Sequence, residues 1–227
     1  MSLVEAIRLT EIFLALALLQ QSLEHLRATQ DERKLFIPRI ILSILLLAGL
    51  WTSWISILLL IHSIIILKHF DGPYNGGSDR MSLLILSCLG LIHLMPSSQL
   101  QGYIFGYLAL QLILSYFIAG FCKIVNREWW SGQALQDLFH FSAYPASEAL
   151  RSWADHPKIL FLASWISILF ELLFPLTLLN QDLLIIGLLA AMVFHLANAY
   201  LFGLNRFVWA WLAAYPSLLW LQTQLAN

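Results

Sequence analysis

Long apolar runs separated by short polar connections dominate this chain. A helix needs roughly 20 apolar residues to cross the hydrocarbon core of a bilayer. Several of the runs reach that length, so the pattern predicts an all-α integral membrane helical bundle of about seven to eight transmembrane helices. The runs are Leu3–Leu26, Leu35–Leu67, Met81–Met95, Tyr103–Cys122, Ile159–Leu179, Leu183–Leu204 and Phe207–Leu221.

The run Leu35–Leu67 is too long for one ordinary span and short for two. If it turns near Gly49–Ser53, every Lys and Arg of the chain except Arg8 falls on one face of the membrane. The positive-inside rule therefore favours two short helices, with both termini on the non-cytoplasmic side. One re-entrant or steeply tilted element is the alternative.

Composition supports a polytopic membrane protein. Hydrophobic residues make up 60% of the chain and charged residues 11%, whereas soluble domains carry about a quarter charged residues. The net charge is −1 and no basic cluster occurs, so no nucleic-acid partner is expected. Both cysteines, Cys88 and Cys122, lie in apolar runs, so no disulfide framework is implied. Glu5, Arg8 and Glu11 interrupt the first run, so we expect it to remain as a span.

One long polar insertion lies at about 124–158, within what we interpret as a single transmembrane domain of residues 1–227. In Gln133–Trp153, apolar residues recur at helical spacing, which predicts an amphipathic helix on the membrane surface, with Pro145 as the expected position of any break. Such a helix could cover the mouth of the bundle, or serve as a lid or docking surface.

The strongest candidate for chemistry is Lys123, which ends an apolar helix just before Trp129 and Trp130. An ammonium group at the edge of the membrane is costly unless it extends to water or has polar partners. A buried lysine loses its charge readily and can then act as a base near neutral pH.

A second candidate is Glu171, near the middle of Ile159–Leu179. A carboxylate at that depth costs about 2.5–3.5 kcal/mol, so it needs a partner or a proton. A functional pocket and a structural hydrogen bond are equally compatible with it. Pro175 lies four residues later and should bend the helix, which suits a cavity wall.

Other polar residues lie within the apolar runs. Glu5, Arg8 and Glu11 recur every three residues, and we favour a self-compensating stripe inside the bundle over a proton or ligand path. His195 and Asn198 share a helix face, which indicates a polar seam; a structural and a catalytic histidine both remain open. No two histidines have a diagnostic spacing, so no metal is predicted.

The loop Phe70–Arg80 has the sequence FDGPYNGGSDR, which is typical of a turn. Ser78 or Asp79 can cap the helix that follows. A helix start of this kind could hold an anion or an oxygen of a ring substrate; a plain interhelical turn is the alternative. The candidate binding residues here are Asn75, Gly76, Gly77, Ser78, Asp79 and Arg80.

Four segments resemble the HTTM (horizontally transferred transmembrane domain) family, which includes the membrane part of vitamin K-dependent γ-carboxylases and smaller bacterial proteins. The chain is more similar in length to the short bacterial forms, such as the membrane component that helps to mature a sporulation-delaying peptide toxin. The second and fourth segments are the most specific. The segments are YNGGSDRM (74–81), YFIAGFCKIVNREWWSGQAL (116–135), FELLFPLTLL (170–179) and HLANAYLFGLNRFVWAWLAAYP (195–216).

The resemblance implies that Lys123 matches the carboxylase lysine proposed to deprotonate a reduced isoprenoid quinone of the vitamin K or menaquinol type. Cys122 stands where the carboxylases have the first of two lysines, and Gly77 stands where they have a histidine. Carboxylases are lyases that act from the luminal face, whereas the charge count places Lys123 on the cytoplasmic face. Under this hypothesis the site comprises the catalytic residues Lys123, Glu171 and His195, and the binding residues Asn75, Gly76, Gly77, Ser78, Asp79, Arg80, Trp129, Trp130, Asn198 and Arg206.

Two further functions stay open. In one, the protein is a non-catalytic membrane partner in the maturation or export of a peptide. In the other, the intramembrane charges belong to a proton-coupled transporter. In each case we expect a multi-pass protein of a bacterial inner membrane that contacts lipid and a peptide or protein substrate.

Overall fold

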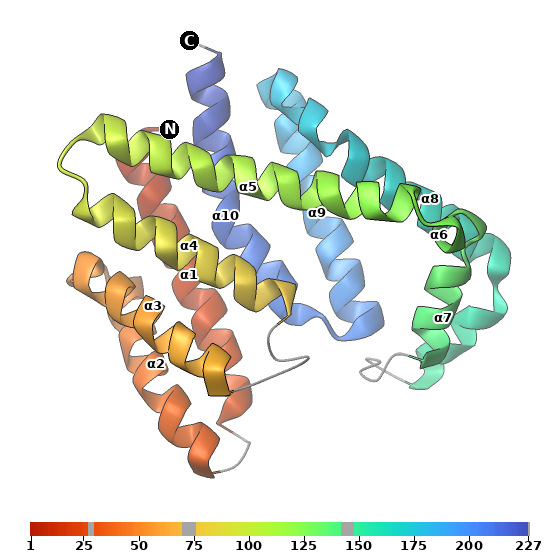
Figure 1. The fold of residues 1–227 in the computed structure, drawn as a ribbon, viewed down its shortest axis with the longest axis horizontal. Coiled ribbons are helices and arrows are strands. Elements are labelled where there is room, and N and C mark those ends of the chain that lie inside the picture. The colour runs from red at the N-terminus through yellow and green to blue at the C-terminus, as the bar shows by residue number, and fades with distance from the viewer. Residues whose placement is uncertain (27–29, 70–75, 142–147, 227) are drawn as a thin grey trace. The chain divides into compact units, whose positions relative to one another are not determined.

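The computed structural model describes residues 1–26, 30–69, 76–141 and 148–226. Those residues form helices and no strand (Figure 1), which confirms the all-α prediction. The elements are α1 (Leu3–His25), α2 (Gln30–Ala48), α3 (Thr52–His69), α4 (Gly77–Leu94), α5 (Ser98–Ile124), α6 (Arg127–Ser131), α7 (Gln133–Phe141), the 3-10 helix η2 (Glu148–Asp155), α8 (Pro157–Leu173), the 3-10 helix η3 (Phe174–Leu179), α9 (Gln181–Phe202) and α10 (Asn205–Leu225).

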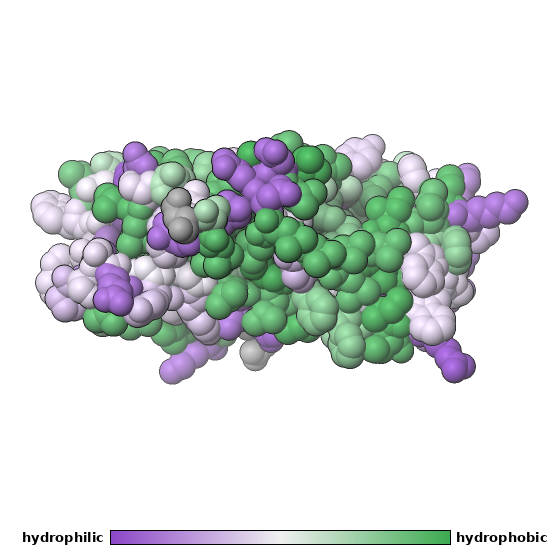
Figure 2. Space-filling view, turned by 90° about the horizontal axis from the view of Figure 1, so that it is seen from above, coloured by the Kyte–Doolittle hydropathy of each residue, from purple (hydrophilic) through white to green (hydrophobic). Residues whose placement is uncertain are grey.

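Four helical segments of the described chain are long and apolar enough to cross a membrane: Gly77–Leu94, Ser98–Ile124, Pro157–Leu179 and Gln181–Phe202. Many large apolar side chains of these segments are exposed, and Figure 2 shows hydrophobic residues over much of the face that it displays. A soluble protein rarely exposes so large an apolar surface. The chain is therefore an integral membrane protein, and spans beyond these four stay a prediction.

The long run Leu35–Leu67 forms two helices, as predicted. Helix α2 ends at Ala48 and α3 begins at Thr52. Gly49 in the connection has a φ of +76°, a left-handed conformation that favours glycine. Its free face lies against the Arg8 guanidinium, because a Cβ on Gly49 would lie 3.1 Å from Arg8 Nη2.

Pro175 changes the geometry of its helix, also as predicted. Helix α8 ends at Leu173, and the chain continues as the 3-10 helix η3. Proline has no N–H to donate and its ring crowds the carbonyl four residues earlier, so a regular α-helix cannot continue through it.

The polar insertion forms α6, α7 and η2. Phe139 of α7 packs with Ala154 of η2 and Leu160 of α8, and Leu135, Leu201 and Phe202 pack against this cluster. Phe141, the last residue of α7, is 79% exposed. The insertion therefore has one packed and one exposed apolar side, as an amphipathic element at a membrane surface does. Pro145 lies outside the described residues.

The chain separates into two compact units. One consists of Met1–Leu110 and Arg206–Asn227, and the other of Gln111–Asn205. In the first unit α1 packs against α2 and α4, and α3 packs against α2 and α4. In the second, α8 contacts α6, α7 and both 3-10 helices, and η3 contacts α9.

Candidate functional site

The second unit brings Lys123 and Glu171 together. Lys123 lies in the last turn of α5, and its Nζ donates a hydrogen bond to Glu171 Oε2 of α8. The Glu171 side chain is 4% exposed and that of Lys123 is 16% exposed. The ammonium also lies 5.0 Å from the centre of the Trp129 ring. Glu171 thus has the partner that its depth requires, and Lys123 keeps one open side.

A glycine one turn before the lysine allows the two helices to meet. A Cβ on Gly120 would lie 2.7 Å from the backbone nitrogen of Leu172 and 2.9 Å from Glu171 Cβ. Backbone atoms cannot move aside as a flexible side chain can. The close contact between α5 and α8, and with it the Lys123–Glu171 pair, therefore depends on a residue without a side chain.

Helix α6 holds the two tryptophans. Trp129 accepts a hydrogen bond at its carbonyl from Ser164 Oγ, and Trp130 accepts one at its carbonyl from Trp165 Nε1 at 3.2 Å. These bonds fix α6 to α8 and place the Trp129 ring beside the ammonium. The Trp130 indole instead donates to the Ile124 carbonyl at 2.7 Å. Trp129 therefore contacts the ammonium, whereas Trp130 closes the end of α5.

His195 lies in an aromatic cluster of the same unit. Its Nε2 and the hydroxyl of Tyr116 form a hydrogen bond of 2.8 Å. Phe170, Phe174 and Phe194 surround these two rings. Tyr116 precedes Lys123 by seven residues on α5, which is two helical turns and about 10 Å along the axis. The buried histidine is thus linked to the helix that carries the lysine, through a tyrosine that sequence reasoning missed.

Asn198 lies near the end of α9. Its backbone carbonyl accepts hydrogen bonds from the backbone nitrogens of Gly203 and Leu204, a contact that any residue at this position would make. Gly203 has a φ of +70°, the left-handed conformation of a helix C-terminus.

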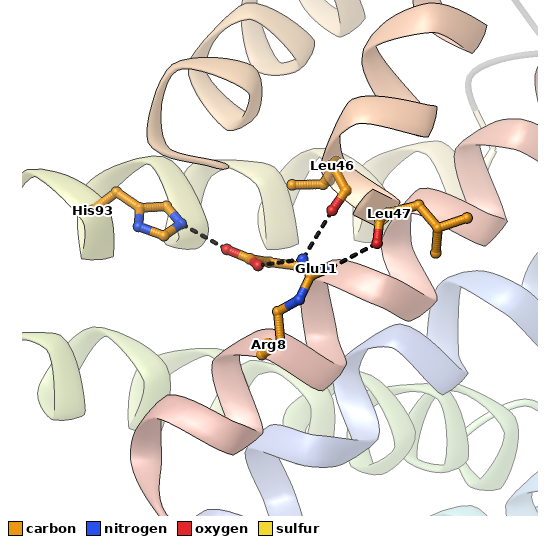
Figure 3. Close-up of polar contacts among 5 residues, drawn as sticks. All are labelled: Arg8, Glu11, Leu46, Leu47 and His93. Carbon is orange, nitrogen blue, oxygen red and sulfur yellow. Dashed lines mark hydrogen bonds and ion pairs between the residues drawn. The ribbon is translucent and has the colours of Figure 1, made fainter. Parts of the chain in front are cut away.

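The charged stripe of α1 lies in the first unit. Arg8 Nη1 binds Glu11 Oε2 at 2.9 Å, and Arg8 donates to the carbonyls of Leu46 at 2.8 Å and Leu47 at 2.6 Å (Figure 3). The other Glu11 oxygen lies 2.7 Å from His93 Nε2. Arg8 and Glu11 thus compensate one another inside the unit, as expected.

Glu5 does not belong to this stripe, so that part of the prediction is wrong. Its carboxylate accepts a hydrogen bond from the Ser2 backbone nitrogen at 2.8 Å, and the Ser2 hydroxyl accepts one from the Glu5 nitrogen. The two residues form a capping box at the start of α1. A Glu at the third position of a helix can serve its own cap, and here that local bond replaces a contact with Arg8.

The predicted binding loop also lies in the first unit, apart from Asn75, which is outside the described residues. Gly76 is the N-cap of α4 and makes no side-chain cap bond, so the expectation that Ser78 or Asp79 caps this helix is wrong. They occupy the first turn instead, where Asp79 Oδ1 accepts a hydrogen bond from Gln21 Nε2 at 2.6 Å. Gly77 lies against the Phe207 ring, and the side chain of Arg80 is exposed.

Arg206 takes part in a separate contact of the first unit. Its Nε donates to Glu24 Oε2 at 2.8 Å, and its Nη2 lies 3.1 Å from His25 Nε2. The predicted site residues thus fall into two groups. Gly76–Arg80 and Arg206 belong to one unit, and Lys123, Trp129, Trp130, Glu171, His195 and Asn198 belong to the other.

Comparison with protein families gives one match. A family model described as the HTTM domain matches residues 94–222, which is more than half of the chain. The match includes the segments 116–135, 170–179 and 195–216, and with them Lys123, Glu171 and His195; segment 74–81 lies before it. No curated protein and no solved structure shows a significant match.

Proposed function

Because the chain belongs to the HTTM family, we propose that it is an integral membrane enzyme in which Lys123, held by Glu171, takes a proton from a hydroxyl group of a reduced isoprenoid quinone. The observation that carries this proposal is the half-buried lysine hydrogen-bonded to a buried carboxylate. A quinol of the vitamin K or menaquinol type supplies an acidic hydroxyl and two electrons when it is bound.

The pair can move a proton within itself. In one form Nζ is an ammonium and Glu171 is a carboxylate; in the other the proton lies on Glu171 Oε2 and Nζ is a neutral amine. Burial reduces the advantage of the charged form, since two desolvated ions recover little of their hydration energy by pairing. In the neutral form Nζ has a lone pair that can accept a hydroxyl proton. The ammonium that results then offsets the negative charge left on the substrate oxygen.

The surroundings of Nζ fit an aromatic, weakly acidic substrate. The Trp129 ring contacts the ammonium and offers a flat apolar surface beside it. The 16% exposure of Lys123 leaves a side on which a substrate can approach, while Glu171 is closed off. The His195–Tyr116 pair and its phenylalanines would form the apolar wall deeper in the unit.

The test is oxygen-dependent turnover of a quinol. The purified protein in mild detergent would receive menaquinol and O2, and the quinone epoxide would be measured by chromatography with mass spectrometry; one quinol and one O2 give one epoxide and one water. We expect Lys123→Met to lower the rate by about 10²–10⁴-fold. Lys158→Met, which removes an exposed lysine at the start of α8, is the matched control and should retain the rate. Equal rates in wild type and Lys123→Met would refute the proposal.

A second candidate function rests on a different observation. Large apolar side chains of the insertion are exposed: Trp130, Leu138, Phe141 and Trp153. Such a surface suits a non-catalytic partner that holds a peptide during maturation or export. Extraction of the purified protein separates the two functions, because bound quinone supports the enzyme, whereas a co-purifying peptide without quinone supports the partner.

A further inference from the structure

The first unit contains a cavity of about 700 Å³. None of its lining residues belongs to the unit that holds the proposed base. Pockets for small molecules measure about 300–1,000 Å³, so the cavity has the size of a ligand site. It is lined by Leu3 of α1, by residues of α5 between Ser98 and Leu110, and by residues of α10 between Trp220 and Gln224.

Two glycines of α5 and a tryptophan of α10 shape this cavity. A Cβ on Gly102 would lie 3.3 Å from Trp220 Cη2, and a Cβ on Gly106 would lie 3.8 Å from Trp220 Cζ3. The Trp220 indole is also 5.6 Å from the centre of the Phe105 ring, so it packs along this side of α5. The contact at Gly106 is an ordinary van der Waals distance, and Gly106 lines the cavity. A larger side chain at Gly106 would therefore fill the cavity before it disturbed the helices.

Polar lining groups lie at one end of the cavity and apolar ones at the other. Ser98 and Gln99 lie in the first turn of α5 and Gln224 in the last turn of α10, whereas Gly106 and Leu110 follow two to three turns later on α5. Helix α5 has 27 residues and a length of about 40 Å, which exceeds the roughly 30 Å of the hydrocarbon core. Its polar first turn therefore suits the membrane surface, and the cavity extends from there for about 18 Å along the helix.

The lining side chains carry no charge but can donate and accept hydrogen bonds. The Gln99 amide donates to the Tyr103 hydroxyl at 2.8 Å, so that hydroxyl can donate onward and the Gln99 carbonyl can accept. The start of α5 and the end of α10 both contribute to the polar end, and the opposite signs of their dipoles offset one another. This end therefore suits a head group that has hydroxyl donors and carbonyl acceptors without a net charge.

We propose that the cavity binds an uncharged acylglycerol, with its hydroxyl and ester oxygens at the Gln99 end and its hydrocarbon chain beside Gly106. Tyr103, Tyr107 and Leu110 are exposed, so the cavity opens to the surroundings of α5, which are lipid in a membrane. A hydrocarbon chain gains little by leaving other lipid chains, so the head group must decide which lipid is retained. The proposal does not depend on the proposed enzyme activity, because the cavity and Lys123 belong to different units.

Thermal unfolding of the full-length protein in phosphatidylcholine nanodiscs tests this site. Monoolein at a hundredfold excess over its Kd should raise the Tm by roughly 5–10 °C. Oleate has the same chain but a carboxylate head, and no lining cation offsets that charge. At pH 9 oleate should need at least about tenfold more ligand for half of the effect. No shift with monoolein, or equal half-saturating concentrations for both ligands, would overturn the proposal.

Gly106→Leu should fill the cavity and abolish the monoolein shift, and leucine favours the helix more than glycine does. The matched control is Ala190→Leu, which adds the same side chain at an exposed position of α9 and should keep the shift. If Gly106→Leu does not fold, Gln99→Leu removes an exposed polar group of the cavity and should raise the half-saturating concentration about tenfold.

Equal shifts in the cavity variant and in Ala190→Leu would also contradict the proposal. The two glycines could instead admit a helix of a second copy of this chain. Light scattering in detergent would then show a dimer in wild type and a monomer in Gly106→Leu, and this result would overturn the acylglycerol as the occupant.

Discussion

The Lys123–Glu171 pair leads to a prediction that separates its structural role from its chemical one. The perturbation is a double-mutant cycle of Lys123→Met, Glu171→Leu and the combination of both. Each single substitution leaves one charged or polar group in an apolar setting, since the side chains are only 16% and 4% exposed. Breaking a buried pair in this way costs about 3–5 kcal/mol.

We expect each single variant near the lower end of that range. Lys123 can reach water through its open side, and Glu171 can take up a proton. At about 3 kcal/mol, a chain of this length should lose roughly 6–12 °C in Tm. The double variant replaces the pair by apolar side chains of similar size, which is often neutral or stabilising. Its Tm should therefore return to within about 4 °C of wild type, with a coupling free energy of at least about 3 kcal/mol.

The assay is thermal unfolding of the four proteins in one detergent, followed by quinol turnover for each. The double variant is the informative one, because it should be stable and inactive. Additive losses of stability would refute the pairing of the two side chains. A stable double variant with wild-type turnover would instead show that the pair only holds α5 to α8.

Three further predictions concern packing and can be checked by the same unfolding measurement. Gly120→Ala should lower the Tm although alanine favours helices, because its Cβ would lie 2.7 Å from the backbone nitrogen of Leu172; an unchanged Tm would contradict the close contact. Gly132→Ala should cost more than about 1 kcal/mol, since Gly132 has a φ of +82° and a Cβ added there would lie 2.7 Å from the Phe161 nitrogen. Arg8→Met should cost about 2–4 kcal/mol through the lost bonds to Glu11 and two carbonyls, whereas the exposed Arg33→Met should change little.

Local features of the fold could be predicted from the sequence. The break near Gly49 followed from charge and length, and the change of helix type after Leu173 followed from Pro175. Both depend on a few neighbouring residues. The N-cap residue of α4 was harder to predict. Ser78 and Gly76 both suit the start of a helix, and only the backbone conformation shows that the helix begins after Gly76.

Contacts between helices could be predicted only in kind. The positions of Glu171 and Lys123 in apolar helices indicated that each needs a polar partner. They are 48 residues apart in the chain, however, and the hydrophobic periodicity does not show which helices contact one another. Gly120 permits the close contact between α5 and α8, and its only sequence signal is a glycine one turn before a lysine. Tyr116 and Gln21 were missed because a tyrosine or glutamine in a helix has many possible partners, and only the folded chain selects His195 and Asp79.

The identity of the cations also limits where proton chemistry can occur. Arginine stays protonated in proteins, so Arg8, Arg39 and Arg206 can fix charge but cannot take up a proton. Among the cations with a described partner in the second unit, Arg151 pairs with an exposed Glu148, whereas Lys123 pairs with a buried carboxylate. Lysine can lose its proton, and a buried carboxylate can receive it. The proposed base is therefore expected at Lys123 and not at an arginine of the first unit.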